Sequence, residues 1–277
     1  MISAEPLVLR GVHHTAFPTW KPKSTVEFYR DALGLTVRHA ITAKGWGRKH
    51  EQHPDFLHFF FDTGDDNMLA FFYYIGTQPH PAIAELRGYL ALSRHTAWAA
   101  RDVAELRRWR DRIAAAGVRV SEAIEHEILH SIYFRDPNGY DMEITTQIRA
   151  LDERDTRDAE SSVQAMIDVF GDDNVGGATI EDFWRRKGTN ASGCAISLLR
   201  VPEFEPLVRA LANVSGVSIA TRGDYAIAET GSDLVLERAA CGVGHAVWFG
   251  ALTGGIAGRI VEFSADTLRL APLTSPE

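Results

Sequence analysis

Apolar and polar positions follow the same order twice in the first half of the chain. In each cycle a short alternating run predicts a strand, an amphipathic segment predicts a helix, and three further alternating runs predict strands. The strands expected in the first cycle are residues 12–17, 35–43, 56–61 and 68–75. Those expected in the second cycle are residues 92–99, 118–122, 127–134 and 140–146.

The two predicted helices have recognisable start and stop signals. Ser24 and Glu27 have the spacing of a capping box, and Gly34 follows the last apolar position of the first helix. Asp102 opens the second helix and Gly117 ends it. Residues 9–148 therefore contain two successive βαβββ units.

Each unit leaves sheet edges and one sheet face uncovered, so we expect the two units to pair into a cupped sheet that encloses a cavity. Along the last strand of the second unit, successive side chains point to opposite faces of the sheet. Glu143 points inward, together with Asp141 and Thr145, while Met142 and Ile144 pack against helix.

Three side chains that can bind a metal ion lie at inward-facing positions of this arrangement. His14 and His95 each begin a strand, in the similar sequences H-T-A-F and H-T-A-W, and Glu143 lies on the last strand. Two imidazoles and one carboxylate are the donor set of a mononuclear non-haem iron site. The sequence thus predicts that His14, His95 and Glu143 bind Fe²⁺, with Mn²⁺ or another divalent ion as the alternative.

Composition excludes some classes of partner. The chain has 277 residues, 45% hydrophobic and 24% charged, with a net charge of −8, which argues against nucleic acid and anionic membranes as partners. Cys194 and Cys241 form no metal-type pair and no disulfide framework, and the first residues do not form a secretory signal. We therefore expect a cytoplasmic protein.

Residues beyond the second unit have a weaker pattern. Residues 149–192 are charged and helix-prone and are interpreted as a helical linker. Residues 193–277 contain a strand, a helix and further strands, with a glycine-rich, charge-free stretch at 242–258 that is interpreted as buried strands and turns. We expect a smaller α+β domain here, which covers the cup or makes a subunit interface in a homo-oligomer.

The double unit resembles the vicinal oxygen chelate superfamily, also called the glyoxalase/bleomycin resistance/dioxygenase fold. The sequence features that carry the resemblance are the two H-T-A strand starts, F-Y-R-D-A-L-G-L from Phe28 and D-P-N-G-Y-D-M-E ending at Glu143. The spacing from Ile124 through His126, Tyr133 and the D-P-N-G turn to Glu143 is similar to the signature of type I extradiol ring-cleaving dioxygenases.

This resemblance implies roles for residues around the metal. His126 and Tyr133 correspond to residues that reach the bound substrate. Ala70 occupies the place where glyoxalases carry a fourth ligand, a glutamate, which favours an open site with three ligands. Asn67 replaces the histidine that usually acts as acid–base partner, and asparagine cannot shuttle a proton near neutral pH. His126, or a cluster of His50, His53 and His58, is the expected substitute.

The expected function is an iron(II)-dependent dioxygenase that opens the ring of a catechol-like aromatic with O₂. A metal-dependent isomerase, epimerase or lyase of the same superfamily is one alternative, because Asn67 is no handicap there. A protein that binds an aromatic compound or antibiotic is the other. Trp46, Phe71 and Trp98 are expected as apolar walls of the cup.

Overall fold

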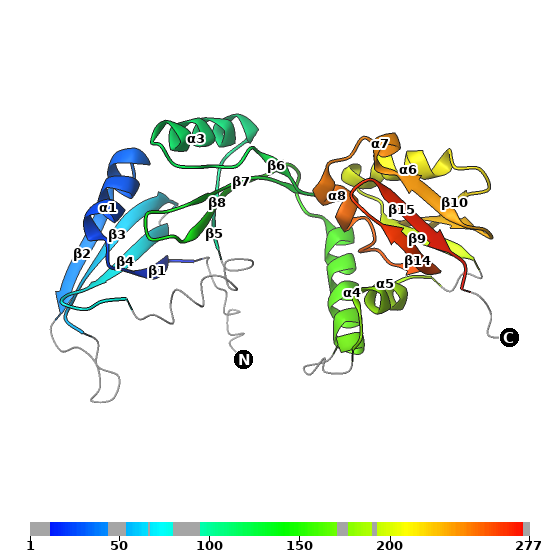
Figure 1. Cartoon of the computed structure of the whole chain (residues 1–277), viewed down its shortest axis with the longest axis horizontal. Coiled ribbons are helices and arrows are strands. Elements are labelled where there is room, and N and C mark those ends of the chain that lie inside the picture. Colours follow the sequence, from blue (N-terminus) through cyan, green and yellow to red (C-terminus); the bar gives the residue numbers. More distant parts are fainter. Residues whose placement is uncertain are drawn as a thin grey trace, which may run out of the picture. The chain divides into compact units, whose positions relative to one another are not determined.

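The computed structural model describes residues 12–43, 54–65, 67–79, 95–170, 177–189 and 193–273. The chain divides into two compact units (Figure 1). The first unit comprises residues 1–123 and 131–146, and the second comprises residues 124–130 and 147–277. The fold is mixed α+β, with four-stranded and three-stranded sheets.

The first half of the first unit is a four-stranded sheet with strand order β1-β4-β3-β2. Strands β1 and β4 are parallel, and the other neighbours are antiparallel. Its elements are β1 (His14–Thr19), α1 (Pro22–Val26), the π-helix η1 (Glu27–Ala32), β2 (Val37–Ala43), β3 (Phe56–Gly64) and β4 (Asn67–Tyr74).

The first helix begins earlier than its predicted capping box. Pro22 occupies the first turn, where its missing N–H costs nothing, and Lys21 at the N-cap makes no side-chain cap bond. Ser24 and Glu27 therefore lie inside the helical stretch, and their assignment as a capping box was wrong. The predicted stop is confirmed, because Gly34 has φ +76° directly after the helix.

The second half repeats the same topology, with strand order β5-β8-β7-β6 and β5 parallel to β8 (Figure 1). Its elements are β5 (Thr96–Ala99), α3 (Val103–Ala115), β6 (Ile124–Glu125), β7 (Leu129–Arg135) and β8 (Asp141–Gln147). The predicted pair of βαβββ units is thus confirmed. The predicted strand at 118–122 was wrong, because that segment makes only one isolated bridge, from Val120 to Phe134.

Alternation separates two faces in each half-sheet. One face packs against the helices, where Tyr29 of η1 lies between Phe61, Phe71 and Trp98. Met142 and Ile144 are buried in the same core, as predicted. The prediction of Phe71 and Trp98 as cup walls was wrong, because both rings belong to this helix-side core. We call the opposite face of each half-sheet the inner face.

The D-P-N-G turn before β8 joins the two halves through buried polar groups. Thr19 Oγ1 donates to Asn138 Oδ1 at 2.7 Å, and Asn138 Nδ2 donates to Thr25 Oγ1 at 2.9 Å. Tyr29 OH donates to Asp136 Oδ2 at 3.1 Å. Because buried polar groups need partners, this turn fixes the start of β8 against β1 and the first helix.

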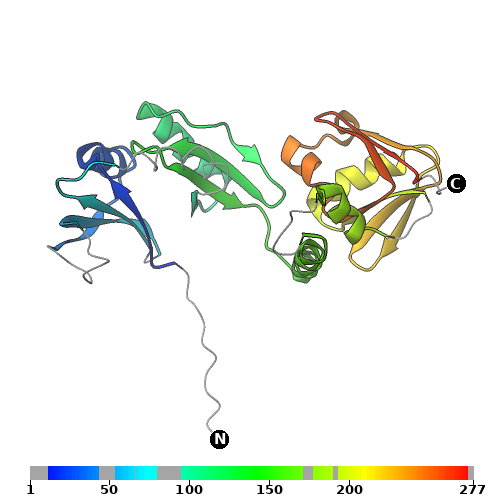
Figure 2. The ribbon, with the colours of Figure 1, turned by 60° about the horizontal axis from the view of Figure 1, so that its bottom comes forward.

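The second unit holds two further sheets, with strand orders β10-β11-β9-β13 and β12-β15-β14. Helix α6 packs against β10 and β11 (Figure 2). Its helices are α4 (Glu153–Phe170), α5 (Ile180–Lys187), η2 (Pro202–Phe204), α6 (Glu205–Ala212), α7 (Arg238–Cys241) and α8 (His245–Gly250). Its strands are β9 (Cys194–Leu199), β10 (Ser218–Arg222), β11 (Tyr225–Thr230), β12 (Leu234–Glu237), β13 (Ile256–Ala257), β14 (Arg259–Phe263) and β15 (Thr267–Ala271).

One sequence expectation changes in this unit. The charge-free stretch contains helix α8, where strands and turns were expected, and Trp248 of that helix is fully buried. The helix-prone segment at 149–192 forms α4 and α5, which pack within the second unit. In the described part of the chain, no helix is both long and apolar enough to cross a membrane.

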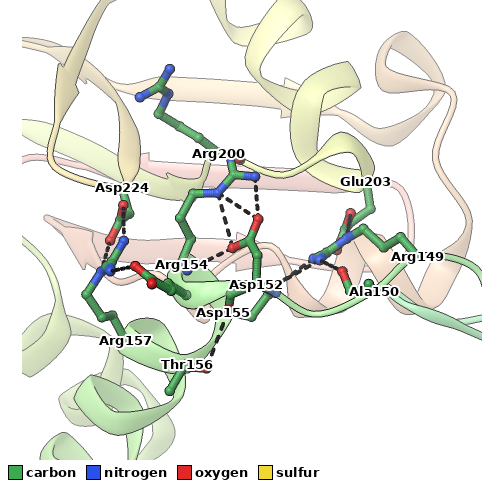
Figure 3. A network of polar contacts seen from close by, with 11 residues as sticks. Arg149, Ala150, Asp152, Arg154, Asp155, Thr156, Arg157, Arg200, Glu203 and Asp224 are labelled. Carbon is green, nitrogen blue, oxygen red and sulfur yellow. Dashed lines mark hydrogen bonds and ion pairs between the residues drawn. The ribbon is translucent and has the colours of Figure 1, made fainter.

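Ion pairs attach the start of α4 to the second unit (Figure 3). Arg149 binds Asp155 at 2.7 Å and Glu203 at 2.6 Å, and all three side chains are largely buried. Further along the helix, Arg157 binds Asp224 at 2.8 Å. The adjacent guanidinium holds the pKa of Asp155 below its ordinary value.

Candidate metal and substrate site

Glu143 is the central residue of the inner face in the second half. Strand β8 carries it opposite Ala97 of β5, and only 5% of the residue is exposed. His95 lies two residues before Ala97 and therefore on the same face. Its Nε2 is 2.9 Å from Glu143 Oε2. The structure thus brings together two of the three predicted metal ligands.

The separation of these two atoms suits a shared metal ion. Donors bonded at about 2.1 Å to one ion and at right angles to each other lie about 3 Å apart. Without a metal, the same contact is a hydrogen bond or ion pair between the imidazole and the carboxylate. His95 remains 41% exposed at its side chain, so the donor pair is accessible from one side.

Tyr133 completes this group from the neighbouring strand β7. Its hydroxyl donates to Glu143 Oε1 at 3.2 Å, and its ring meets that of His95 edge to face at 6.5 Å. Burial, reinforced by the Glu143 carboxylate, raises the pKa of Tyr133 above its ordinary value. The phenol therefore stays protonated at neutral pH and can donate a hydrogen bond.

The inward assignments of Asp141 and Thr145 also agree with the structure. Ser131 of β7 donates to Thr145 Oγ1 at 2.9 Å, and Arg135 of β7 binds Asp141 at 2.7 Å. These contacts flank the one between Tyr133 and Glu143, so the facing side chains of β7 and β8 form one polar row.

His14 lies on the inner face of the first half. It stands opposite Met68 in the β1–β4 register, and its side chain is exposed. Its Nδ1 is 2.8 Å from Nδ1 of His13, and its ring contacts His58 and Phe60. Within the described residues, no three His, Cys, Asp or Glu side chains are grouped to hold a metal ion. The role of His14 as third ligand stays a prediction.

Aromatic side chains form the inner face around His14. His58 stacks on Phe72 with ring centroids 3.6 Å apart, and Phe72 stacks on Tyr74 at 5.8 Å. Burial lowers the pKa of His58 to about 4, with His14 and His39 adding to the effect. The structure thus supplies an apolar wall that differs from the predicted one. Trp46, His50 and His53 lie outside the described residues.

Sequence reasoning named His58 only as one member of a cluster. Its signal was the single polar residue within the run F-L-H-F-F-F, and a polar residue at such a position is expected to be buried. Ala70 is fully buried opposite Ala16, and its methyl side chain offers no donor atom to a metal. The absence of a fourth protein ligand stays a prediction.

Asn67 and His126 have separate surroundings. Asn67 begins β4, and its side-chain amide donates to the Asp65 carbonyl at 2.9 Å. His126 lies in the turn between β6 and β7, where its backbone N–H donates to the Leu129 carbonyl at 2.7 Å. This turn belongs to the second unit, while Glu143 belongs to the first. The roles predicted for Asn67 and His126 stay predictions.

Comparison with known proteins agrees with the topology of the first unit. Residues 11–144 match the family model of the Glyoxalase/Bleomycin resistance protein/Dioxygenase superfamily. A comparison with curated proteins gave no match.

Three of the solved structures that a structural comparison matched to this chain are the following. A lactoylglutathione lyase from Agrobacterium tumefaciens is 22% identical, with 50% of this chain and 94% of that chain covered and a TM-score of 0.35. An antibiotic binding protein from Streptomyces is 16% identical, with 51% and 99% covered and a TM-score of 0.37. A glyoxylase/bleomycin resistance protein/dioxygenase domain from Frankia is 16% identical, with 52% and 96% covered and a TM-score of 0.38.

Proposed function

Since residues 11–144 match the family model of the Glyoxalase/Bleomycin resistance protein/Dioxygenase superfamily, we propose that this protein is a metal-dependent enzyme acting on a small aromatic molecule. The observation that carries the proposal is the 2.9 Å contact between His95 Nε2 and Glu143 Oε2 on the inner face. The specific reaction we propose is extradiol-type cleavage of a catechol-like ring with O₂, with Fe²⁺ as the metal.

The residues that would hold the metal are His95 and Glu143, with His14 from the first half as the third. An imidazole and a carboxylate are suitable donors for Fe²⁺, and Ala70 leaves the fourth protein position empty. When bound, Fe²⁺ supplies coordination sites for the two oxygens of a catecholate and for O₂.

The proposed role of Tyr133 is to donate a hydrogen bond to an oxygen atom of the substrate. Its hydroxyl already faces Glu143, and its raised pKa keeps the donor proton in place. Such a donor stabilises negative charge that develops on the substrate during reaction. Asn67 offers an amide donor in place of a proton shuttle.

The substrate class is supported by the aromatic wall of the first half. The rings of His58, Phe72 and Tyr74 stack nearly parallel, with interplanar angles of 17° and 14° between neighbours. Flat faces of this kind suit a planar apolar molecule.

A second candidate is a protein that binds an aromatic compound without metal chemistry. The contact between His14 and His13 favours it, because the ring nitrogen Nδ1 of His14 faces another imidazole. A metal-dependent isomerase, epimerase or lyase is the third candidate function. It is favoured by Asn67, because these reactions do not need the histidine that Asn67 replaces.

Metal content and oxygen uptake separate these functions. Protein purified anaerobically and loaded with Fe²⁺ should contain about one equivalent of iron, as expected for a single mononuclear site. With a panel of catechols and hydroquinones it should consume O₂ and form a yellow ring-fission product. Bound Mn, Co or Ni without oxygen uptake would indicate an isomerase or lyase. Ligand binding by metal-free protein that takes up no metal would indicate a binding protein.

A further inference from the structure

His58 is a buried imidazole with one nitrogen atom unsatisfied. It lies on β3 with 6% of the residue exposed. In the described structure its Nε2 is buried and has no hydrogen-bond partner. Most buried side-chain nitrogen atoms in native proteins have a partner, so this atom calls for an explanation.

The surroundings of His58 are aromatic. Phe72 stacks on one side of its ring, Phe60 lies at 4.2 Å between centroids, and Phe56 lies at 6.5 Å. Phe rings provide no conventional acceptor or donor for Nε2. With His14 at 6.4 Å between ring centroids, the imidazole is one of few polar groups in a largely aromatic patch. Small-molecule sites typically orient a ligand by few polar contacts of this kind.

Partly exposed ring surface continues from His58 toward the end of β4. Phe72 and Tyr74 are each half-buried, and both stack nearly parallel with their neighbours. Trp20 lies 6.5 Å from Tyr74 between ring centroids and is held by a bond from its Nε1 to Thr77. Aligned rings favour offset stacking of a further flat ring over binding of a flexible aliphatic chain.

We propose that His58 is the polar anchor of a subsite on the inner face of the first half, which binds a planar aromatic ligand through a phenolic hydroxyl. This inference rests on the proposed function and adds the residue that selects a hydroxylated ring. A neutral imidazole can accept from or donate to a hydroxyl, whereas Phe at this position can do neither. The subsite is specific for a hydroxyl group and needs no metal.

Phenol and benzene test the hydroxyl requirement, because they differ only by one hydroxyl group. Phenol also cannot chelate a metal ion through two oxygens. The full-length protein, treated with chelator, is titrated with each probe by calorimetry. Wild-type protein should bind phenol at least about tenfold more tightly than benzene. His58→Phe should abolish that preference while leaving benzene affinity within about twofold. His39→Phe is the matched control, because His39 is exposed on the neighbouring strand β2 and contacts Phe60.

The proposal is overturned if His58→Phe and wild-type protein bind phenol equally, or if the control variant loses the same affinity. A second measurement needs no variant. Nitrogen-15 NMR of the wild-type histidine side chains should show His58 Nε2 shifting with phenol and not with benzene. An unchanged Nε2 signal at saturating phenol, or no phenol binding, also overturns it. Absence of metal and of oxygen uptake would defeat the proposed function and leave this phenol preference in place.

Discussion

Thr19 donates a hydrogen bond to Asn138 at 2.7 Å, although the two residues are 119 positions apart in the chain. Both side chains are buried, at 0% and 5% exposed. Asn138 also donates to Thr25 and Asp136, so one amide satisfies three partners from two distant segments. The turn that precedes the Glu143 strand is therefore a fixed part of the first unit.

Asn138→Ala should destabilise the protein by about 3 kcal/mol, because it removes the buried hydrogen bonds that the amide makes with Thr19, Thr25 and Asp136. Urea unfolding followed by far-UV circular dichroism measures the change. Asn213→Ala is the control, since Asn213 is exposed at the end of α6 and should change stability by less than about 0.5 kcal/mol. Equal midpoints for the two variants would show that the network contributes little.

Glu143→Gln should lower metal affinity at least about tenfold while the fold is retained, because the amide keeps the shape of the side chain and loses its charge. Elemental analysis after dialysis against limiting Fe²⁺ measures occupancy. Asp141→Asn is the matched control on the same strand and face, where the carboxylate binds Arg135. Full iron occupancy in Glu143→Gln would remove this residue from the proposed metal site.

Tyr133→Phe should reduce kcat for oxygen uptake about 100-fold with iron content unchanged, because the variant loses a donor to the substrate oxygen. Its free energy of unfolding should fall by only about 1 kcal/mol. Tyr140→Phe provides the contrast, since its hydroxyl donates to the Pro18 carbonyl at 2.7 Å in the link between the halves. That variant should lose stability and keep kcat, and the reverse pattern would contradict both assignments.

Asp155→Asn should destabilise the protein by about 2 kcal/mol at pH 7, because it breaks the buried pair with Arg149. The folded-state pKa of Asp155 lies below its ordinary 3.8, so the stabilisation is complete above about pH 4 and is lost as pH falls further. Urea midpoints of wild type and variant should therefore converge as pH falls below about 4. Glu160→Gln, at an exposed position of the same helix, is the control. Its urea midpoint should change with pH in the same way as that of wild type. A difference that stays constant with pH would rule out the ion pair as its source.

The topology of the first unit was predictable because alternation and helix signals repeat over short distances. Alternation along β8 correctly placed Glu143 inward and Met142 in the core. The same rule applied to β5 would have turned Trp98 away from His95 and onto the helix side, where its ring contacts Tyr29. The prediction for Trp98 was wrong because it relied on the aromatic side chain and not on its position along the strand.

Other features depend on contacts that no local pattern encodes. The isolation of His58 Nε2 arises from the register of β3 with β4, which places Phe72 opposite it. The convergence of His14 on Glu143 stays a prediction, because it depends on how the two half-sheets approach each other and alternation within one strand cannot fix that distance. The helix at 245–250 was missed because glycine and apolar residues suit buried strands as well as a short helix.

The long separation between Thr19 and Asn138 has a consequence during synthesis on the ribosome. Synthesis proceeds at roughly 5–20 residues per second, so on the order of ten seconds pass between the synthesis of Thr19 and that of Asn138. Throughout that interval β1 lacks the turn that fixes it, so the emerging polypeptide offers an incomplete sheet to chaperones and to neighbouring nascent chains.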